Sequence, residues 1–182
     1  MSTMPNKHYP GRRQETHTPA THVPSSDAHA GDVISYFPKA HTDRVLALLG
    51  GPEVFRIPSP NEMTVISMLR TGFPASAVDF LGTNIQASTA ELAQMLGMST
   101  RILARRRREG VLSSQESERL FRSARAIAQS EEAFGDLKNA LDWLRTPLIV
   151  LGGATPISLL DTEIGGELVL RILINIVYGL SA

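Results

Sequence analysis

The chain has 182 residues, a formal net charge of zero and no cysteine. This length suffices for one domain of ordinary size or for two small ones. The lack of cysteine excludes a disulfide framework, a thiolate nucleophile and a cysteine-ligated metal site. The start shows no signal-peptide core, and no apolar run approaches the roughly 20 residues that span a bilayer, so we expect a cytoplasmic protein without a membrane partner.

Charge is distributed unevenly along the chain. Residues 101–125 hold eight arginines and three acidic residues, a local charge of +5, whereas residues 131–182 hold three basic and seven acidic residues, a local charge of −4. Charge runs of this kind are most often solvated helix faces. A basic middle and an acidic end also fit two different partners.

Residues 1–40 are predicted to be a disordered tail. Val23 is the only aliphatic residue besides alanine and methionine among residues 1–32, so this segment cannot bury enough apolar surface to offset the entropy of ordering. Its histidines are not expected to bind metal, because their spacing fits no helix or zinc finger and no cysteine or paired carboxylate accompanies them. Residues 41–58 are predicted to be a short helix, Asp43–Leu49, closed by Gly50-Gly51-Pro52 and followed by a linker.

Residues 59–133 are predicted to form a domain of short amphipathic helices. Two of them, T-A-E-L-A-Q-M-L-G-M-S-T-R-I-L-A-R-R-R-R-E-G at residues 89–110, have the pattern of a helix-turn-helix. Ala93 lets the two helices approach, Gly97 permits the turn, and leucines fill the space between the helices. The second helix would be the recognition helix. Its candidates to contact phosphates or guanine edges are Thr100, Arg101, Arg105 and Arg108.

The uninterrupted arginines from Arg105 to Arg108 leave two interpretations of this helix open. Either the helix frays after Leu103, or an arginine stem covers the core while its charged head stays in water. A plain α-hairpin with a solvated arginine face is the alternative to DNA binding. After it, Ser113-Ser114-Gln115-Glu116 fits a capping box that starts the longest helix, to about Ser130. Arg119, Arg122 and Arg125 on that helix extend the basic surface or form its solvent side.

Residues 134–182 contain three further short helices. The first carries Leu137, Ala140, Leu141 and Leu144 on one apolar face. Gly152-Gly153 predicts a turn, Thr155-Pro156 predicts the start of a second helix, and Leu148–Leu151 is compatible with a short extended segment. The third, from about Gly166 to Tyr178, is apolar except for a narrow stripe in which Glu167 is placed to pair with Arg171. It is either buried in its own domain or covered on one side by a partner.

This region resembles a known family. The pattern A-x-x-W-L-x-x-P, L-G-G-x-T-P, L-L-x-T-x-x-G and a terminal Y-G is similar to the C-terminal toxin-binding region of Xre/MbcA/ParS-type antitoxins, the antidote halves of RES–Xre type II toxin–antitoxin modules. The resemblance covers roughly Glu62 to Ala182. It implies an all-α fold: the tail, a helix-turn-helix domain at 59–133 and a small helical toxin-binding domain at 134–182.

The resemblance also implies a function. The partner would be a RES-domain toxin, related in fold to ADP-ribosyltransferases and acting on NAD, whose active site the antitoxin covers. The antitoxin, expected as a homodimer within a hetero-oligomer, would repress its own operon by binding operator DNA. The candidate toxin-binding residues are Trp143, Leu144, Gly152, Gly153, Thr155, Pro156, Leu160, Arg171, Tyr178, Gly179 and Leu180.

Catalysis is not expected of this chain. No histidine follows His41, so a Ser-His-Asp or Cys-His site would need a histidine from the tail. The L-G-G-A-T-P segment lacks the lysine and the preceding strand of a phosphate-binding loop. We therefore expect no catalytic residues, no metal and no cofactor. Two alternatives to an antitoxin remain: a stand-alone transcription regulator with a C-terminal dimerisation helix, and an interaction scaffold that does not bind DNA.

Overall fold

The computed structural model describes residues 39–58 and 60–177, all of which fall in one compact unit. The predicted disordered tail, apart from its last two residues, lies outside the described residues, as do Tyr178, Gly179 and Leu180. The described residues form helices and one isolated β-bridge, between Pro74 and Val111, but no strand. The all-α prediction is confirmed.

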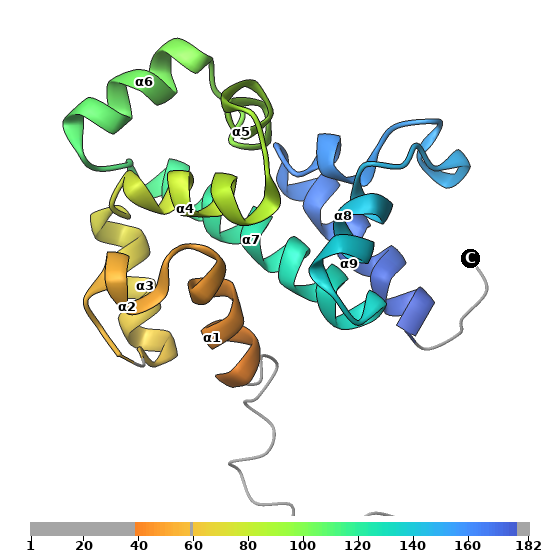
Figure 1. Ribbon diagram of the computed structural model, residues 1–182, viewed down its shortest axis with the longest axis horizontal. Helices are drawn as coiled ribbons and strands as arrows, with labels where there is room; N and C mark the ends of the chain where they lie inside the picture. Colours follow the sequence, from red (N-terminus) through yellow and green to blue (C-terminus); the bar gives the residue numbers. More distant parts are fainter. Residues whose placement is uncertain (1–38, 59, 178–182) are drawn as a thin grey trace, which may run out of the picture. The chain divides into compact units, whose positions relative to one another are not determined.

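The helices follow one another closely along the chain. Figure 1 labels the α-helices in chain order, and two short 3₁₀ helices, η1 and η2, lie between α8 and α9. Their bounds are α1 Lys39–Leu48, α2 Gly51–Phe55, α3 Glu62–Thr71, α4 Ser76–Ile85, α5 Thr89–Met95, α6 Thr100–Glu109, α7 Ser114–Phe134, α8 Leu137–Leu144, η1 Ile149–Leu151, η2 Pro156–Leu159 and α9 Glu163–Val177.

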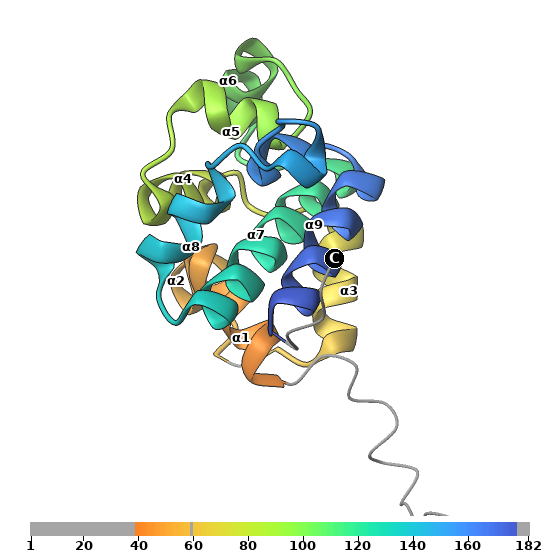
Figure 2. The ribbon, with the colours of Figure 1, turned by 90° about the vertical axis from the view of Figure 1, so that its right-hand side faces the viewer.

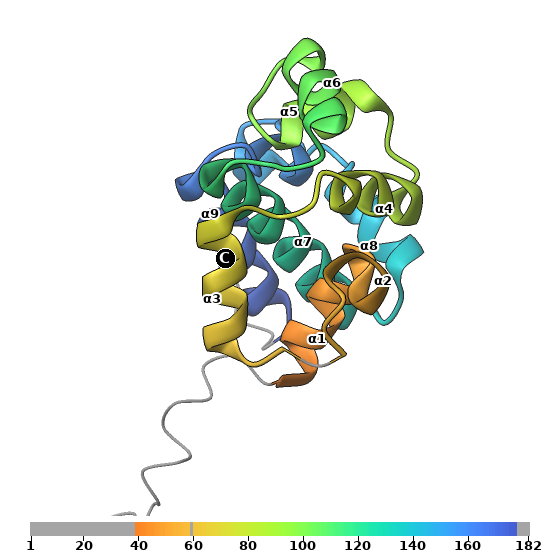
Figure 3. The same ribbon diagram turned by 90° about the vertical axis from the view of Figure 1, so that its left-hand side faces the viewer.

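Helix α7 is the central element of the unit. In Figure 1, α1 and α3 lie on one side of it and α8 and α9 on the other, and it contacts all four. The side views in Figures 2 and 3 show α7 at the centre, with α5 and α6 together at the end away from α1. Small buried residues such as Ser117, Ala124 and Ala128 let the neighbouring helices approach closely. Both predicted domains therefore pack on one helix, and the boundary between residues 133 and 134 stays a prediction.

Local sequence signals explain where most helices begin. Ser88, Ser99 and Ser113 each accept a hydrogen bond from the backbone N–H three residues later, which caps α5, α6 and α7. At Ser113 the capping box is complete, because the Glu116 carboxylate accepts the return bond from the Ser113 N–H at 2.7 Å. The helix runs four residues beyond its predicted end at Ser130, as far as Phe134, where Gly135 with φ +85° ends it.

Helix boundaries depart from the predictions in four further places. Helix α1 begins at Lys39 rather than Asp43, and Pro52 stands in the first turn of the unpredicted α2, where its missing N–H is no loss. Of Leu148–Leu151 only Leu148 is extended, because the rest forms η1. Helix α9 begins at Glu163 instead of Gly166.

The C-terminal helix α9 lacks the ion pair expected on its polar stripe. No ion pair within 4.0 Å joins Glu167 to Arg171 among the described residues, so the expected pairing is wrong. The helices at 39–58 and 60–177 include none that is long and apolar enough to cross a bilayer.

Candidate functional site

Helices α5 and α6 form the predicted helix-turn-helix. Leu92 and Leu103 are buried between them, and Ala93 is almost fully buried as well. Gly97 joins the helices with φ +57°, a left-handed conformation that favours glycine. Gly82 on α4 lies beneath Leu92, where a Cβ would come within 2.7 Å of a leucine methyl group. The pair is thus seated on the core through α4 and α7.

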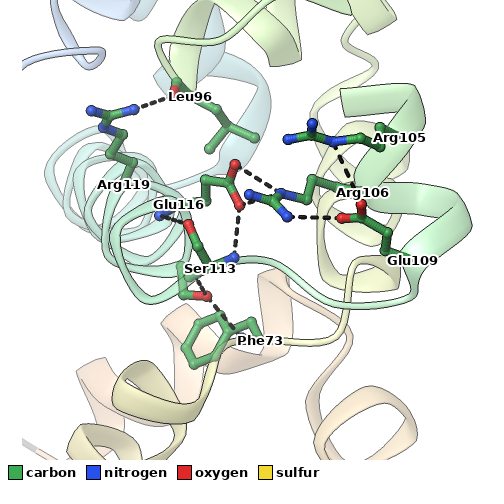
Figure 4. Close-up of polar contacts among 9 residues, drawn as sticks. Phe73, Leu96, Arg105, Arg106, Glu109, Ser113, Glu116 and Arg119 are labelled. Atoms are coloured by element: carbon green, nitrogen blue, oxygen red, sulfur yellow. Dashed lines mark hydrogen bonds and ion pairs between the residues drawn. The ribbon is translucent and has the colours of Figure 1, made fainter. Parts of the chain in front are cut away.

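The arginine run of α6 continues as helix to Glu109, so the helix does not fray after Leu103. Its arginines fall into two sets. Arg106 is half-buried, and its Nε lies 2.7 and 2.9 Å from the two carboxylate oxygens of Glu116 on α7, as Figure 4 shows. Arg107 pairs with Asp79 of α4 at 2.7 Å. These arginines hold α6 against the two helices beneath it.

The other set faces solvent. Arg101, Arg105 and Arg108 are exposed at i, i+4 and i+7, and Thr100 is exposed at the start of the helix. Arg105 makes an i,i+4 pair with Glu109 at 3.5 Å, drawn in Figure 4, and an exposed pair of this kind contributes little. One face of α6 therefore presents cations while the opposite face is anchored.

Glu116 joins the cap of α7 to the recognition helix. Burial opposes ionisation of its carboxyl group, but hydrogen bonds from the Ser113 backbone N–H and the Arg106 guanidinium outweigh that effect. The pKa of Glu116 is therefore below its ordinary value. The carboxylate stays charged at neutral pH and keeps both contacts.

The arginines of α7 are not on the solvent side of the helix, and that expectation is wrong. Arg119 is half-buried and donates from Nη1 to the Leu96 carbonyl oxygen at 3.3 Å (Figure 4). The stem of Arg122 lies under Gly166 of α9, where a Cβ would come within 3.1 Å of Arg122 Cδ. Arg125 is also half-buried. The predicted basic surface is therefore confined to α6.

The C-terminal third packs on α7 through its leucines. Asp136 caps α8 by accepting from the Asn139 N–H at 2.7 Å, and the Trp143 ring lies 5.3 Å from that of Phe134. A Cβ on Gly165 would fall well inside contact distance of the Leu159 carbonyl oxygen, so only glycine fits where α9 crosses η2. The tight crossing fixes α9 against the turn before it.

The predicted toxin-binding residues divide by burial. Leu144 and Leu160 are fully buried and Pro156 is buried, so these side chains pack in the core of this structure. Trp143 and Thr155 are half-buried, whereas Gly152, Gly153 and Arg171 are exposed. Toxin binding by these residues, exposed or buried, stays a prediction.

Sequence reasoning missed the most exposed apolar side chains of this region. Ile149 is 98% exposed and Val150 61%, both on η1, and Ile164 is exposed at the start of α9. The available signal was the apolar run Leu148–Leu151 beside Gly152-Gly153, which cannot all be buried on so short a loop.

A salt bridge connects the helix-turn-helix to the C-terminal third. Arg145, at the end of α8, donates from Nε to Glu91 of α5 at 3.0 Å and from Nη2 to the Ile85 carbonyl oxygen at 2.9 Å. Beside it, a groove of about 190 Å³ lies between α5 and η2, lined by residues that include Met95 and Thr155. Over the described part of the chain, no group of three side chains is arranged to hold a metal ion.

Comparison with known proteins identifies both regions. Residues 64–125 match the model of the antitoxin Xre-like helix-turn-helix domain, and residues 129–179 match that of the antitoxin Xre/MbcA/ParS C-terminal toxin-binding domain. A protein of Yersinia enterocolitica named "Antitoxin Xre" is 32% identical over 111 residues, which cover 60% of this chain and 75% of that protein. The chain belongs to the Xre antitoxin family.

Two further relatives are similar to this Xre family member. An "Antitoxin Xre" of Pseudomonas putida is 31% identical over 136 residues, or 75% of this chain and 82% of that protein. A "Prs ADP-ribosylating antitoxin" of Sphingobium sp. is 38% identical over 80 residues, or 39% of this chain and 50% of that protein. The exposed arginine face of α6 thus belongs to the family's helix-turn-helix domain, and η1, η2 and α9 belong to its toxin-binding domain.

Proposed function

We propose that this Xre family member neutralises a cognate RES-domain toxin by covering its active site, and that it represses its own operon through α6. The observation that carries the proposal is the presence, in one chain, of the family's helix-turn-helix domain at 64–125 and its toxin-binding domain at 129–179. The chain would act as a non-enzymatic regulator without a cofactor of its own.

The resemblance to RES–Xre modules supports a toxin that acts on NAD. The name of the Sphingobium relative, a "Prs ADP-ribosylating antitoxin", is consistent with a partner whose chemistry is ADP-ribosyl transfer. Among the described residues, the proposed contacts are the exposed Gly152, Gly153 and Arg171. The half-buried Trp143 and Thr155 are proposed to contact the toxin through their exposed atoms. Tyr178, Gly179 and Leu180 are proposed to extend the contact. Leu144, Pro156 and Leu160 support it from within the core.

Operator binding is proposed for the exposed face of α6. Thr100, Arg101, Arg105 and Arg108 would contact phosphates and guanine edges, while Arg106 and Arg107 fix the helix that carries them. Because phosphate contacts release counterions, binding should weaken steeply as salt concentration rises. A homodimer within the toxin complex would present two such helices to two half-sites.

Co-expression with the product of the adjacent reading frame tests the proposal. We expect the full-length chain, tagged at its N-terminus, to capture that product and to restore growth of cells in which the product alone lowers NAD and stops growth. Truncation after Val177 should abolish rescue while operator binding is kept. Full rescue by the truncated chain would contradict the proposed role of the last five residues. Failure of the full-length chain to capture or rescue would overturn toxin neutralisation.

A stand-alone transcription regulator is the second candidate, favoured by the anchored α6 with its free arginine face. It predicts tight, salt-dependent operator binding by the chain alone and no capture of the adjacent product. The scaffold alternative loses its motivation, because it depended on an interrupted recognition helix and α6 is continuous from Thr100 to Glu109.

A further inference from the structure

The loop from Leu148 to Ala154 holds two apolar side chains out in water. We call it the apolar loop. Ile149 is the most exposed large hydrophobic residue among those described, at 98%, and Val150 follows it along the chain at 61%. Isolated exposed apolar residues are ordinary on protein surfaces. Two neighbouring ones at the tip of a loop are the kind of feature that marks a contact with another molecule.

Hydrogen bonds close the apolar loop on itself. The Leu148 N–H donates to the Ala154 carbonyl oxygen at 3.1 Å, and the Gly153 N–H donates to the Leu148 carbonyl oxygen at 2.9 Å. Gly152 and Gly153 have φ angles of +65° and +88°, so the turn uses the conformation that glycine adopts most readily. The exposure of Ile149 is therefore built into an ordered turn.

The apolar loop is also anchored where it begins and ends. Before it, Arg145 is bound to Glu91 and to the Ile85 carbonyl oxygen, at 3.0 and 2.9 Å. After it, Pro156 and Ile157 are buried in the core. A side chain presented by an anchored loop loses little conformational freedom on binding, which favours affinity.

The surroundings of the loop suit the centre of an interface. Between Arg145 and Asp161 the chain carries no charged residue over 15 positions. Interface cores are depleted in charge, whereas their rims are polar. Ile164, by contrast, is exposed on a helix between Glu163 and Glu167 and has the surroundings of a rim.

We infer that Ile149 and Val150 insert into an apolar depression on the toxin and form the anchor of the toxin–antitoxin interface. The toxin is the occupant because the loop lies within residues 129–179, the family's toxin-binding domain. This inference rests on the proposed toxin neutralisation and adds the residues that carry the binding energy. It places the anchor outside the set that the sequence motifs suggested.

A matched pair of full-length variants tests it, with the product of the adjacent reading frame as the probe. In one variant Ile149 and Val150 are both replaced by Asp. In the control, Met63→Asp, an apolar residue on α3 that is 69% exposed and lies outside the toxin-binding domain receives one negative charge, where the double variant receives two. Dissociation constants are measured by calorimetry or surface plasmon resonance, together with Tm. Ile149→Ala gives the size of the contact without adding a charge.

We expect Ile149→Ala to weaken binding about 10- to 100-fold, which is about 1.4 to 2.8 kcal/mol at tenfold per 1.4 kcal/mol. The double Asp variant should lose detectable binding, and Met63→Asp should bind like the wild type. All three variants should keep the wild-type Tm, because their side chains are exposed.

Three results would overturn the inference. One is wild-type toxin affinity of the double Asp variant, which would leave the proposed function standing. Another is a wild-type chain that is a dimer and a double Asp variant that is a monomer but still binds the toxin. This result would make the loop a contact between copies of this chain. The third is a fall in the Tm of Ile149→Ala, which would show that the loop serves the fold. If the wild-type chain itself fails to bind the probe, the result contradicts both the proposed toxin neutralisation and the inferred role of the loop.

Discussion

Adjacent glycines at the start of α9 should respond in opposite ways to the same substitution. In Gly165→Ala the new methyl group would meet the Leu159 carbonyl oxygen, a backbone atom, and would also lie 2.8 Å from Thr162 Oγ1. In Gly166→Ala it would lie 3.1 Å from Arg122 Cδ, which belongs to a flexible side chain. A backbone oxygen cannot move aside as easily as the atoms of a flexible side chain, so only Gly165→Ala should strain the fold.

The magnitudes follow from this difference. Replacing glycine by alanine in a helix gains up to about 1 kcal/mol, and overpacking against backbone costs about 3 kcal/mol at the upper end of its usual range. Gly165→Ala should therefore lose about 2 kcal/mol, or about 4 to 8 °C in Tm for a chain of this size. Gly166→Ala should be neutral or slightly stabilised.

Thermal unfolding of both full-length variants, followed by circular dichroism, measures the difference. Toxin capture should be weakened in Gly165→Ala and unchanged in Gly166→Ala, because only the first disturbs the crossing of α9 and η2. A Gly165→Ala protein that unfolds within about 1 °C of the wild type would refute the reasoning. So would a Gly166→Ala protein that loses as much stability as Gly165→Ala.

Three further predictions concern the anchor of the recognition helix, the core of the C-terminal third and the exposed face of the recognition helix. Glu116→Gln should lower Tm at pH 7, and its deficit should shrink as the pH falls through the folded pKa of Glu116. The pKa of Glu116 in the folded state lies below the ordinary value of 4.5. The charged carboxylate therefore stabilises the fold at pH values above that ordinary pKa, and this contribution is lost as the pH falls through the folded-state pKa. A deficit independent of pH, or an equal one in the exposed Glu118→Gln, would contradict this. Leu160→Ala should lower the free energy of unfolding, measured in urea, by about 2 to 5 kcal/mol. A loss below about 1 kcal/mol would contradict a core position for Leu160. Arg101→Ala should weaken binding to a fragment of the chain's own promoter and reduce the slope of log K against log salt by about 1, whereas an unchanged slope would exclude a phosphate contact.

Helix starts were largely predictable because their signals are local. A cap such as Ser99 or Ser113 acts on N–H groups within three residues, so the sequence alone contains both partners. The apolar face of α8 was likewise predictable, since Ala140, Leu141 and Leu144 recur at helical spacing and are buried. Contacts whose partner lies elsewhere in the chain were not predicted. Arg106 is fixed by a carboxylate 10 residues away and Arg107 by one 28 residues away.

Residue type, spacing and capping by themselves determined that this chain is helical and where the second helix of its helix-turn-helix lies. The family was indicated by the resemblance of the motifs around Trp143 and Gly165, and the family model confirms it. Only the tertiary structure decided which residues of those motifs are buried and which are exposed. Leu144 is buried because α7 packs against α8, and Leu160 is buried where η2 meets α5, α8 and α9, whereas Ile149 on η1 is exposed to solvent. Periodicity defines a face, but the elements packed against that face come from distant sequence, and they alone decide whether it meets the core or solvent.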